Sequence, residues 1–102
     1  HAKIEESSRL ANVVHRSFVA GMRNKYDGIK DLGVKKAPFY VLLGARMPSI
    51  LIETSFISNK KECRRLMSKQ YQAHVAASIA DGVEKYIKAT NPKQLSVVGF
   101  TQ

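Results

Sequence analysis

The sequence has 102 residues, enough for one small domain with a single core or for part of a larger one. No apolar run approaches the roughly 20 residues that a membrane-spanning helix needs, and the polar amino-terminal stretch does not resemble a secretory signal. The formal net charge of +9 favours an anionic partner, or serves solubility alone. The basic residues are scattered and lack the interleaved aromatic residues that bind single-stranded nucleic acid, so nucleic acid is not the expected partner.

The first half of the chain predicts one helix and two strands. Apolar residues recur at helical spacing from Ile4 to about Lys25 and predict a long amphipathic helix. Residues 27–33, rich in glycine and aspartate, predict a loop. Residues 39–43, with aromatic and branched side chains, predict a strand. Residues 49–52 are apolar without alternation, which predicts a second strand covered on both faces.

The second half predicts two helices and a tail. Asn59 followed by Glu62 predicts a helix start with Asn59 as its cap, and this helix runs to about Met67. The single cysteine excludes an internal disulfide; Cys63 shares a helical face with Leu66 and Met67 and is expected to act as a small core hydrophobe. A further helix is predicted from residue 68 until the Asn-Pro pair at 91–92 ends it, and no structure is assigned to the tail of residues 91–102.

The order helix, strand, strand, helix, helix predicts an α/β fold, with a mixed sheet flanked by helices. A sheet of two strands is marginal on its own, and a strand covered on both faces needs neighbours on both sides. We therefore expect the chain to be a portion of a larger three-layer domain.

Glu53 is the candidate catalytic carboxylate. It directly follows the second predicted strand, and ligands gather at the carboxyl ends of strands in open α/β sheets. Apolar surroundings there would raise its pKa toward the range that suits general acid–base catalysis. A structural role is equally compatible with this position: Glu53 could cap the following loop or pair with Arg46. Position alone leaves both open.

Residues 47–59, with the sequence MPSILIETSFISN, and the following Glu62 carry a family resemblance. They resemble the carboxy-terminal signature of the zinc-dependent N-acetylmuramoyl-L-alanine amidases of bacterial cell walls. Other parts are also similar to this family: residues 8–11 to its Ser-x-x-Leu-Ala helix, 33–42 to its pre-strand loop and strand, and 71–86 to its final helix. Thr54 and Ser55 are similar to the branch that separates daughter cells in Gram-negative bacteria. Leu32 departs from the pattern, since many relatives have an arginine there.

The resemblance implies that residues 1–90 are the carboxy-terminal part of an amidase catalytic domain. Glu53 matches the family's catalytic glutamate. The implied reaction is hydrolysis of the amide between N-acetylmuramic acid and L-alanine of the stem peptide, with Glu53 as general base and acid beside a zinc-bound water. Peptidoglycan is then the substrate, a divisome activator protein a further partner, and the periplasm or cell envelope the location of a secreted protein.

No zinc ligand is assigned to this chain. The family holds zinc with two histidines and a glutamate from the amino-terminal half of its domain, so we expect the ligands outside this chain and expect the chain alone to be inactive. His15 and His74 match non-ligand helices and are expected at the surface or at its boundary. His1 begins a His-Ala pair like that of a family ligand motif, but it lies too close to residues 8–11. The rival hypothesis is a non-catalytic basic module that binds an anionic polymer, either cell wall or nucleic acid.

Overall fold

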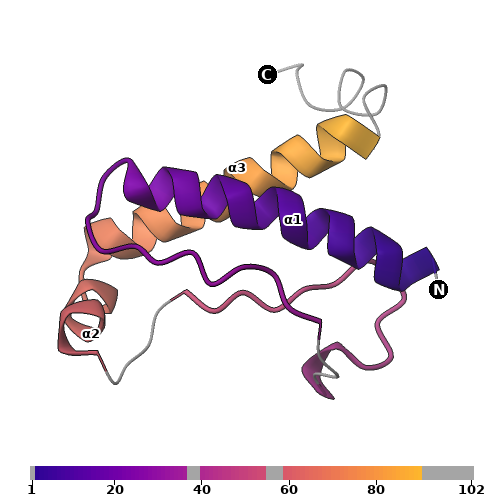
Figure 1. The fold of residues 1–102 in the computed structure, drawn as a ribbon, viewed down its shortest axis with the longest axis horizontal. Coiled ribbons are helices and arrows are strands. Elements are labelled where there is room, and N and C mark those ends of the chain that lie inside the picture. Colours follow the sequence, from indigo (N-terminus) through magenta and orange to yellow (C-terminus); the bar gives the residue numbers. More distant parts are fainter. Residues whose placement is uncertain (1, 37–39, 55–58, 91–102) are drawn as a thin grey trace.

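The computed structural model describes residues 2–36, 40–54 and 59–90 of the chain (Figure 1). Its elements are α1 (Ala2–Arg23), the 3-10 turn η1 (Tyr40–Leu42), α2 (Lys60–Leu66) and α3 (Lys69–Thr90). Two extended segments, residues 29–36 and 48–54, run along one side of α1 (Figure 1). The three predicted helices are confirmed, with ends that differ from the prediction by about two residues.

The predicted mixed α/β sheet and its three-layer arrangement are wrong, because the described residues contain no β-strand. Residues 40–42 of the first predicted strand form η1, and Phe39 lies outside the described residues. Residues 49–52 are extended but are not covered on both faces, since Leu51 is 47% exposed. A strand is defined by backbone hydrogen bonds to a neighbouring strand. The backbone amide of Ser49 donates instead to the hydroxyl of Ser7 on α1.

The core lies between α1 and α3, which pack together in antiparallel fashion over most of their length (Figure 1). Its buried centre is formed by Phe18, Met22 and Tyr71. Partly buried apolar side chains pack around this centre from the loop after α1, from α2 and from α3: Tyr26, Ile29, Leu66, Val75 and Ile79. The apolar stripe at helical spacing in α1 therefore faces α3, as its periodicity predicts.

Small residues allow α1 and α3 to approach closely. Gly82 of α3 is buried against α1, and a Cβ atom on it would lie 2.8 Å from the Cα of Val14 and 3.1 Å from the Cβ of Ser17. Gly21 of α1 faces the side chain of Ser78 on α3 in the same way. Both glycines sit inside helices, where glycine weakens helix formation, and the close packing of the two backbones accounts for them.

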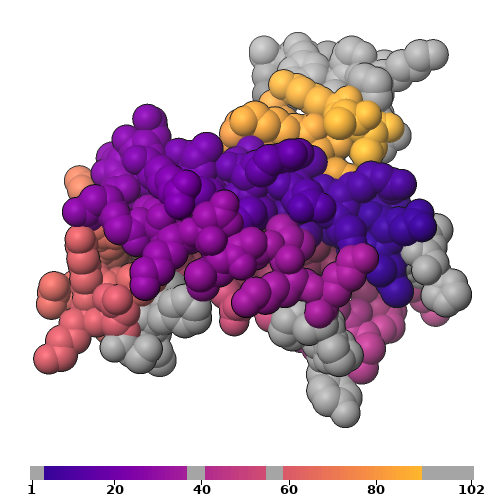
Figure 2. Space-filling model, viewed as in Figure 1, coloured from indigo at the N-terminus to yellow at the C-terminus, as the bar shows by residue number. Residues whose placement is uncertain are grey.

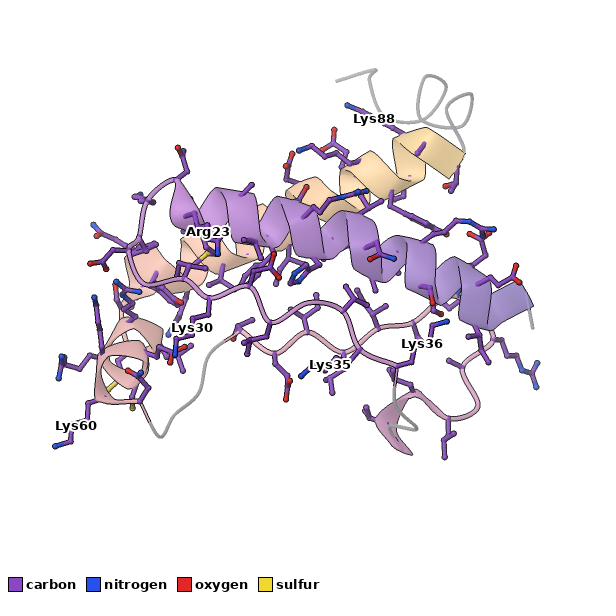
Figure 3. All side chains as sticks on the ribbon, viewed as in Figure 1. Arg23, Lys30, Lys35, Lys36, Lys60 and Lys88 are labelled. Atoms are coloured by element: carbon purple, nitrogen blue, oxygen red, sulfur yellow. The ribbon has the colours of Figure 1, made fainter. Side chains whose placement is uncertain are left out.

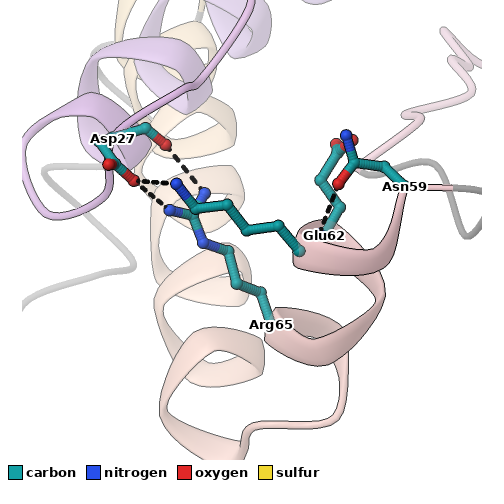
Figure 4. Close-up of polar contacts among 5 residues, drawn as sticks. Asp27, Asn59, Glu62 and Arg65 are labelled. Carbon is teal, nitrogen blue, oxygen red and sulfur yellow. Dashed lines mark hydrogen bonds and ion pairs between the residues drawn. The ribbon is translucent and has the colours of Figure 1, made fainter.

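The short helix α2 begins at the predicted cap. The side-chain oxygen of Asn59 accepts a hydrogen bond of 3.1 Å from the backbone amide of Glu62, so this cap is confirmed (Figure 4). Of the three residues expected on one buried face, only Leu66 packs against the core: Cys63 is half-buried and Met67 is 78% exposed.

The tail of residues 91–102 lies outside the described residues. Among the helices that the structure describes, none combines the length and the apolar character needed to cross a membrane.

Candidate functional site

A hollow of about 1300 Å³ lies beneath α1, between this helix and the two extended segments. Val14, Phe18 and Met22 of α1 are among its apolar lining residues. Segment 29–36 lies on the face visible in Figure 2, below α1, and lines the hollow together with segment 48–54. Both extended segments also contribute apolar residues, among them Leu32, Val34 and Ile52, so the hollow is largely apolar with a few charged side chains, as small-molecule and peptide sites commonly are.

Segment 29–36 is held against α1 by two polar contacts. The Nε2 atom of His15 lies 2.6 Å from the Oδ1 atom of Asp31, and the Nε atom of Arg23 donates to the carbonyl oxygen of Ile29 at 3.2 Å. The same carboxylate oxygen of Asp31 accepts a bond of 2.9 Å from the backbone amide of Gly33, whose φ of +78° favours glycine. The hydrogen bond from His15, and then the one from Gly33, lower the pKa of Asp31 below its ordinary value.

A second set of contacts fixes the end of the hollow near α2. The carboxylate of Asp27 accepts hydrogen bonds from Lys61, at 2.8 Å, and from the guanidinium of Arg65 (Figure 4). The guanidinium also donates to the backbone carbonyl of Asp27 and lies over the ring of Tyr26, 5.3 Å from its centroid. The bond from Lys61, followed by that from Arg65, lowers the pKa of Asp27. The loop after α1 is thereby tied to α2.

Glu53 lies in segment 48–54, is exposed and lines the hollow. The apolar enclosure expected from its position after a buried strand is therefore absent. The alternative pairing with Arg46 is not formed: Arg46 is exposed, and within the described part of the chain neither residue takes part in an ion pair. A carboxylate in this position can accept a proton from a molecule bound in the hollow.

Both described histidines lie at the boundary of the protein, as predicted. His15 is half-buried against Asp31, and the Nε2 atom of His74 donates to the carbonyl oxygen of Gly21 at 2.5 Å. His1 lies outside the described residues. Residues 2–36, 40–54 and 59–90 contain no group of three or more His, Cys, Asp or Glu side chains that could hold a metal ion.

Three exposed lysines line the hollow. Lys30, Lys35 and Lys36 are exposed, follow one another along segment 29–36 (Figure 3) and line the hollow. No ion pair involves them within the described residues, whereas the two other cationic residues of the lining, Lys61 and Arg65, are paired with Asp27. These lysines therefore bring positive charge to the hollow that no ion pair among the described residues compensates.

Sequence reasoning identified Glu53 but missed the ion pairs that hold segment 29–36 and the loop after α1. Asp27 meets its partners on α2 from 34 and 38 residues away, and Asp31 meets His15 from 16 residues away. No local spacing predicts such pairs. The sequence marks these lysines only by the adjacent pair Lys35 and Lys36 after a glycine-containing loop. Such a pair is typical of any exposed segment and does not predict a binding site.

Residues 1–85 match the N-acetylmuramoyl-L-alanine amidase family, and the chain belongs to this family. Among curated proteins it is 37% identical over 82 residues to the N-acetylmuramoyl-L-alanine amidase LytC of Bacillus subtilis, covering 80% of the chain and 16% of that protein. It is 47% identical over 72 residues to the amidase AmiC of Escherichia coli O6:H1, covering 68% and 17%. An uncharacterized protein of Bacillus subtilis, YqiI, is 35% identical over 82 residues, covering 80% and 37%.

The chain thus spans well under half the length of each of these relatives. No solved structure matches it at a significant level.

Proposed function

We propose that this chain is the carboxy-terminal part of a peptidoglycan amidase domain, residues 1–90, and that Glu53 is its catalytic carboxylate. The reaction is hydrolysis of the amide between the lactyl group of N-acetylmuramic acid and L-alanine of the stem peptide. The observation that carries the proposal is the position of Glu53: an accessible carboxylate in the hollow, within the region that matches the amidase family.

The chemistry follows from what a carboxylate can do beside an amide. Water adds its oxygen to the carbonyl carbon, the carbon–nitrogen bond breaks, and the nitrogen leaves as the amine of L-alanine. Glu53 accepts the proton of the attacking water and returns it to the leaving nitrogen. General acid–base catalysis of this kind contributes about 10²- to 10⁴-fold to the rate.

The zinc ion that the family resemblance implies does not fit the described residues. They contain no group of three possible ligands, and His15 and His74 are each engaged with a protein oxygen. We therefore propose that the zinc ligands come from sequence outside this chain, and that the chain alone is inactive.

The finer features of the proposal follow the resemblance of Thr54 and Ser55 to the cell-division branch. They are action in the periplasm or cell envelope and control by a divisome activator protein. The test of Glu53 depends on neither the location nor the activator.

The proposal is tested with a chimera in which residues 1–85 replace the matching region of LytC. Release of stem peptides with a free L-alanine amine is measured on purified peptidoglycan. Glu53→Gln is expected to lower hydrolysis about 100-fold or more while leaving the zinc content unchanged. Glu62→Gln is the matched control, because Glu62 also lines the hollow and its backbone amide keeps the bond to Asn59.

Hydrolysis that survives Glu53→Gln would remove Glu53 from the mechanism. Stoichiometric zinc and turnover by the 102-residue chain alone would contradict the external ligands.

The rival proposal is a non-catalytic basic module. Its support is the net charge of +9 and the unpaired lysines of segment 29–36. It predicts salt-sensitive binding to an anionic polymer and no hydrolysis by any chimera that folds and holds zinc.

A further inference from the structure

The proposed hydrolysis does not account for the unpaired lysines of the hollow. An amide-hydrolysing carboxylate does not need Lys30, Lys35 and Lys36 around the same hollow, and their repulsion for one another is not relieved by any described acidic partner. The contacts of His15 with Asp31 and of Arg23 with Ile29 hold the segment that carries them. The lysines are thus presented on an anchored segment and remain free to bind an anion.

We propose that Lys30, Lys35 and Lys36 bind the free carboxylates of the stem peptide and make the site selective for stem peptides whose carboxylates are not amidated. This inference rests on the proposed function, because it needs the scissile amide to lie at Glu53. The free carboxylates of the stem peptide are then the feature of the substrate that the three lysines recognise.

The spacing of the lysines fits an extended peptide. Lys36 follows Lys30 by six residue steps, so their backbone positions lie at most about 20 Å apart. A stem peptide of about four or five residues spans at most roughly 18 Å when extended. Its carboxylates are distributed along that length, so one peptide can meet more than one lysine.

The charges of the hollow favour a peptide over a uniformly charged polymer. Glu53 and Glu62 also line the hollow and have no cationic partner within the described part of the chain. A phosphodiester polymer would bring negative charge to every part of the hollow, including these carboxylates, at an electrostatic cost. A stem peptide instead offers a neutral amide to Glu53 and its own carboxylates to the lysines.

The test measures binding rather than turnover. The 102-residue chain is sedimented with peptidoglycan sacculi stripped of teichoic acid, either with free carboxylates or with the same carboxylates chemically amidated. The test variant carries Lys30→Gln, Lys35→Gln and Lys36→Gln. The control variant carries Lys25→Gln, Lys60→Gln and Lys69→Gln, which remove equal charge from exposed lysines that do not line the hollow.

The unmodified chain and the control variant should bind sacculi with free carboxylates about tenfold more tightly than amidated ones. The test variant should lose this preference, and the three corresponding Lys→Arg changes should keep it. All variants are checked for unchanged helix content by circular dichroism.

Equal losses in the test and control variants would overturn the proposal, since any reduction of net charge would then suffice. Absence of binding, or equal binding to both kinds of sacculi, would also overturn it. So would tighter binding of soluble teichoic acid or of a single-stranded oligonucleotide. Glu53→Gln removes a negative charge from the hollow and should keep the preference for free carboxylates while abolishing hydrolysis in the chimera, so a failure of the proposed catalytic role appears in hydrolysis and a failure of this inference in binding.

Discussion

Asp31 is the residue through which segment 29–36 is fastened to α1. One carboxylate oxygen contacts both the ring of His15 and the backbone amide of Gly33. Because both hydrogen bonds favour the charged form, the pKa of Asp31 is lower in the folded protein than its ordinary value of 3.8. A carboxyl group with a lowered pKa stabilises the fold above its ordinary pKa and loses that contribution as the pH falls through the folded value.

Replacing this carboxylate gives a pH-dependent prediction. Asp31→Asn should lower the free energy of unfolding at neutral pH, and the difference from the unmodified chain should shrink as the pH falls below about 3.8. Urea denaturation at a series of pH values measures it. Asp81→Asn, which removes an exposed carboxylate from the ion pair with Lys85 on α3, controls for the loss of one negative charge. A difference for Asp31→Asn that persists at acid pH would show that the charge of Asp31 does not hold the segment.

At the scale of elements, the antiparallel pair of α1 and α3 carries the stability of the chain. Their contacts run from Gly21 opposite Ser78, through Val14 opposite Gly82, to the hydroxyl of Tyr86, which donates to Glu6 at 2.6 Å. That last bond raises the pKa of Tyr86, because the neighbouring carboxylate disfavours the phenolate. The pair is therefore fixed at both ends and at its middle.

Gly82→Ala tests how close this packing is. Alanine favours a helix over glycine by about 1 kcal/mol, yet the added methyl group would lie 2.8 Å from the Cα of Val14. We expect the clash to prevail and the free energy of unfolding to fall by about 1–3 kcal/mol, measured by urea denaturation. Ala80→Gly, at an exposed position of the same helix, gives the propensity effect alone. A stabilised Gly82→Ala protein would mean that the two helices can separate at no cost.

The agreement between sequence and structure differs by element for a physical reason. The helices at 2–23 and 69–90 were predictable because each makes its own backbone hydrogen bonds and shows its buried face as a local period, and the helix at 60–66 was predictable from its Asn59 cap. The strands predicted at 39–43 and 49–52 are absent from the described residues, because a strand depends on a partner elsewhere in the chain, which a local pattern does not report. An apolar run predicts only that its side chains avoid water.

The candidate site divides in the same way. Glu53 was found through a local motif, and it does line the hollow. The rest was not found, because the pairs formed by Asp27 and Asp31 join residues far apart in the sequence, and the lysines of segment 29–36 line the hollow only through the placement of that segment.

At the scale of the whole molecule, the chain leaves large apolar side chains exposed after η1. Leu43 and Met47 are 64% and 70% exposed and lie within five residues of one another along the chain. Neighbouring Val41, within η1, is 74% exposed. Exposed apolar groups close together on a surface favour association, unlike single ones.

We therefore expect the isolated chain to associate as its concentration rises and to bind the dye ANS. Leu43→Ser with Met47→Ser should reduce both effects, measured by analytical ultracentrifugation and dye fluorescence. Met67→Ser with Val83→Ser, which changes two exposed apolar residues on separate helices, should have little effect. Equal reductions by the two double variants would assign the association to overall hydrophobicity instead.

The attachment of both extended segments to α1 also has a consequence for the order of folding. Residues 24–68 separate α1 from α3, and closing a loop of that length costs roughly 3 kcal/mol of chain entropy. Burial of the core between the helices offsets most of that cost. The extended segment at Ser49 adds less, because its backbone amide bonds only the hydroxyl of Ser7 on α1. The slow step of refolding should then be the meeting of the two helices. Pulse-labelled hydrogen exchange would show this as protection of the helix amides before that of Ser49, and early protection of Ser49 would reverse the order.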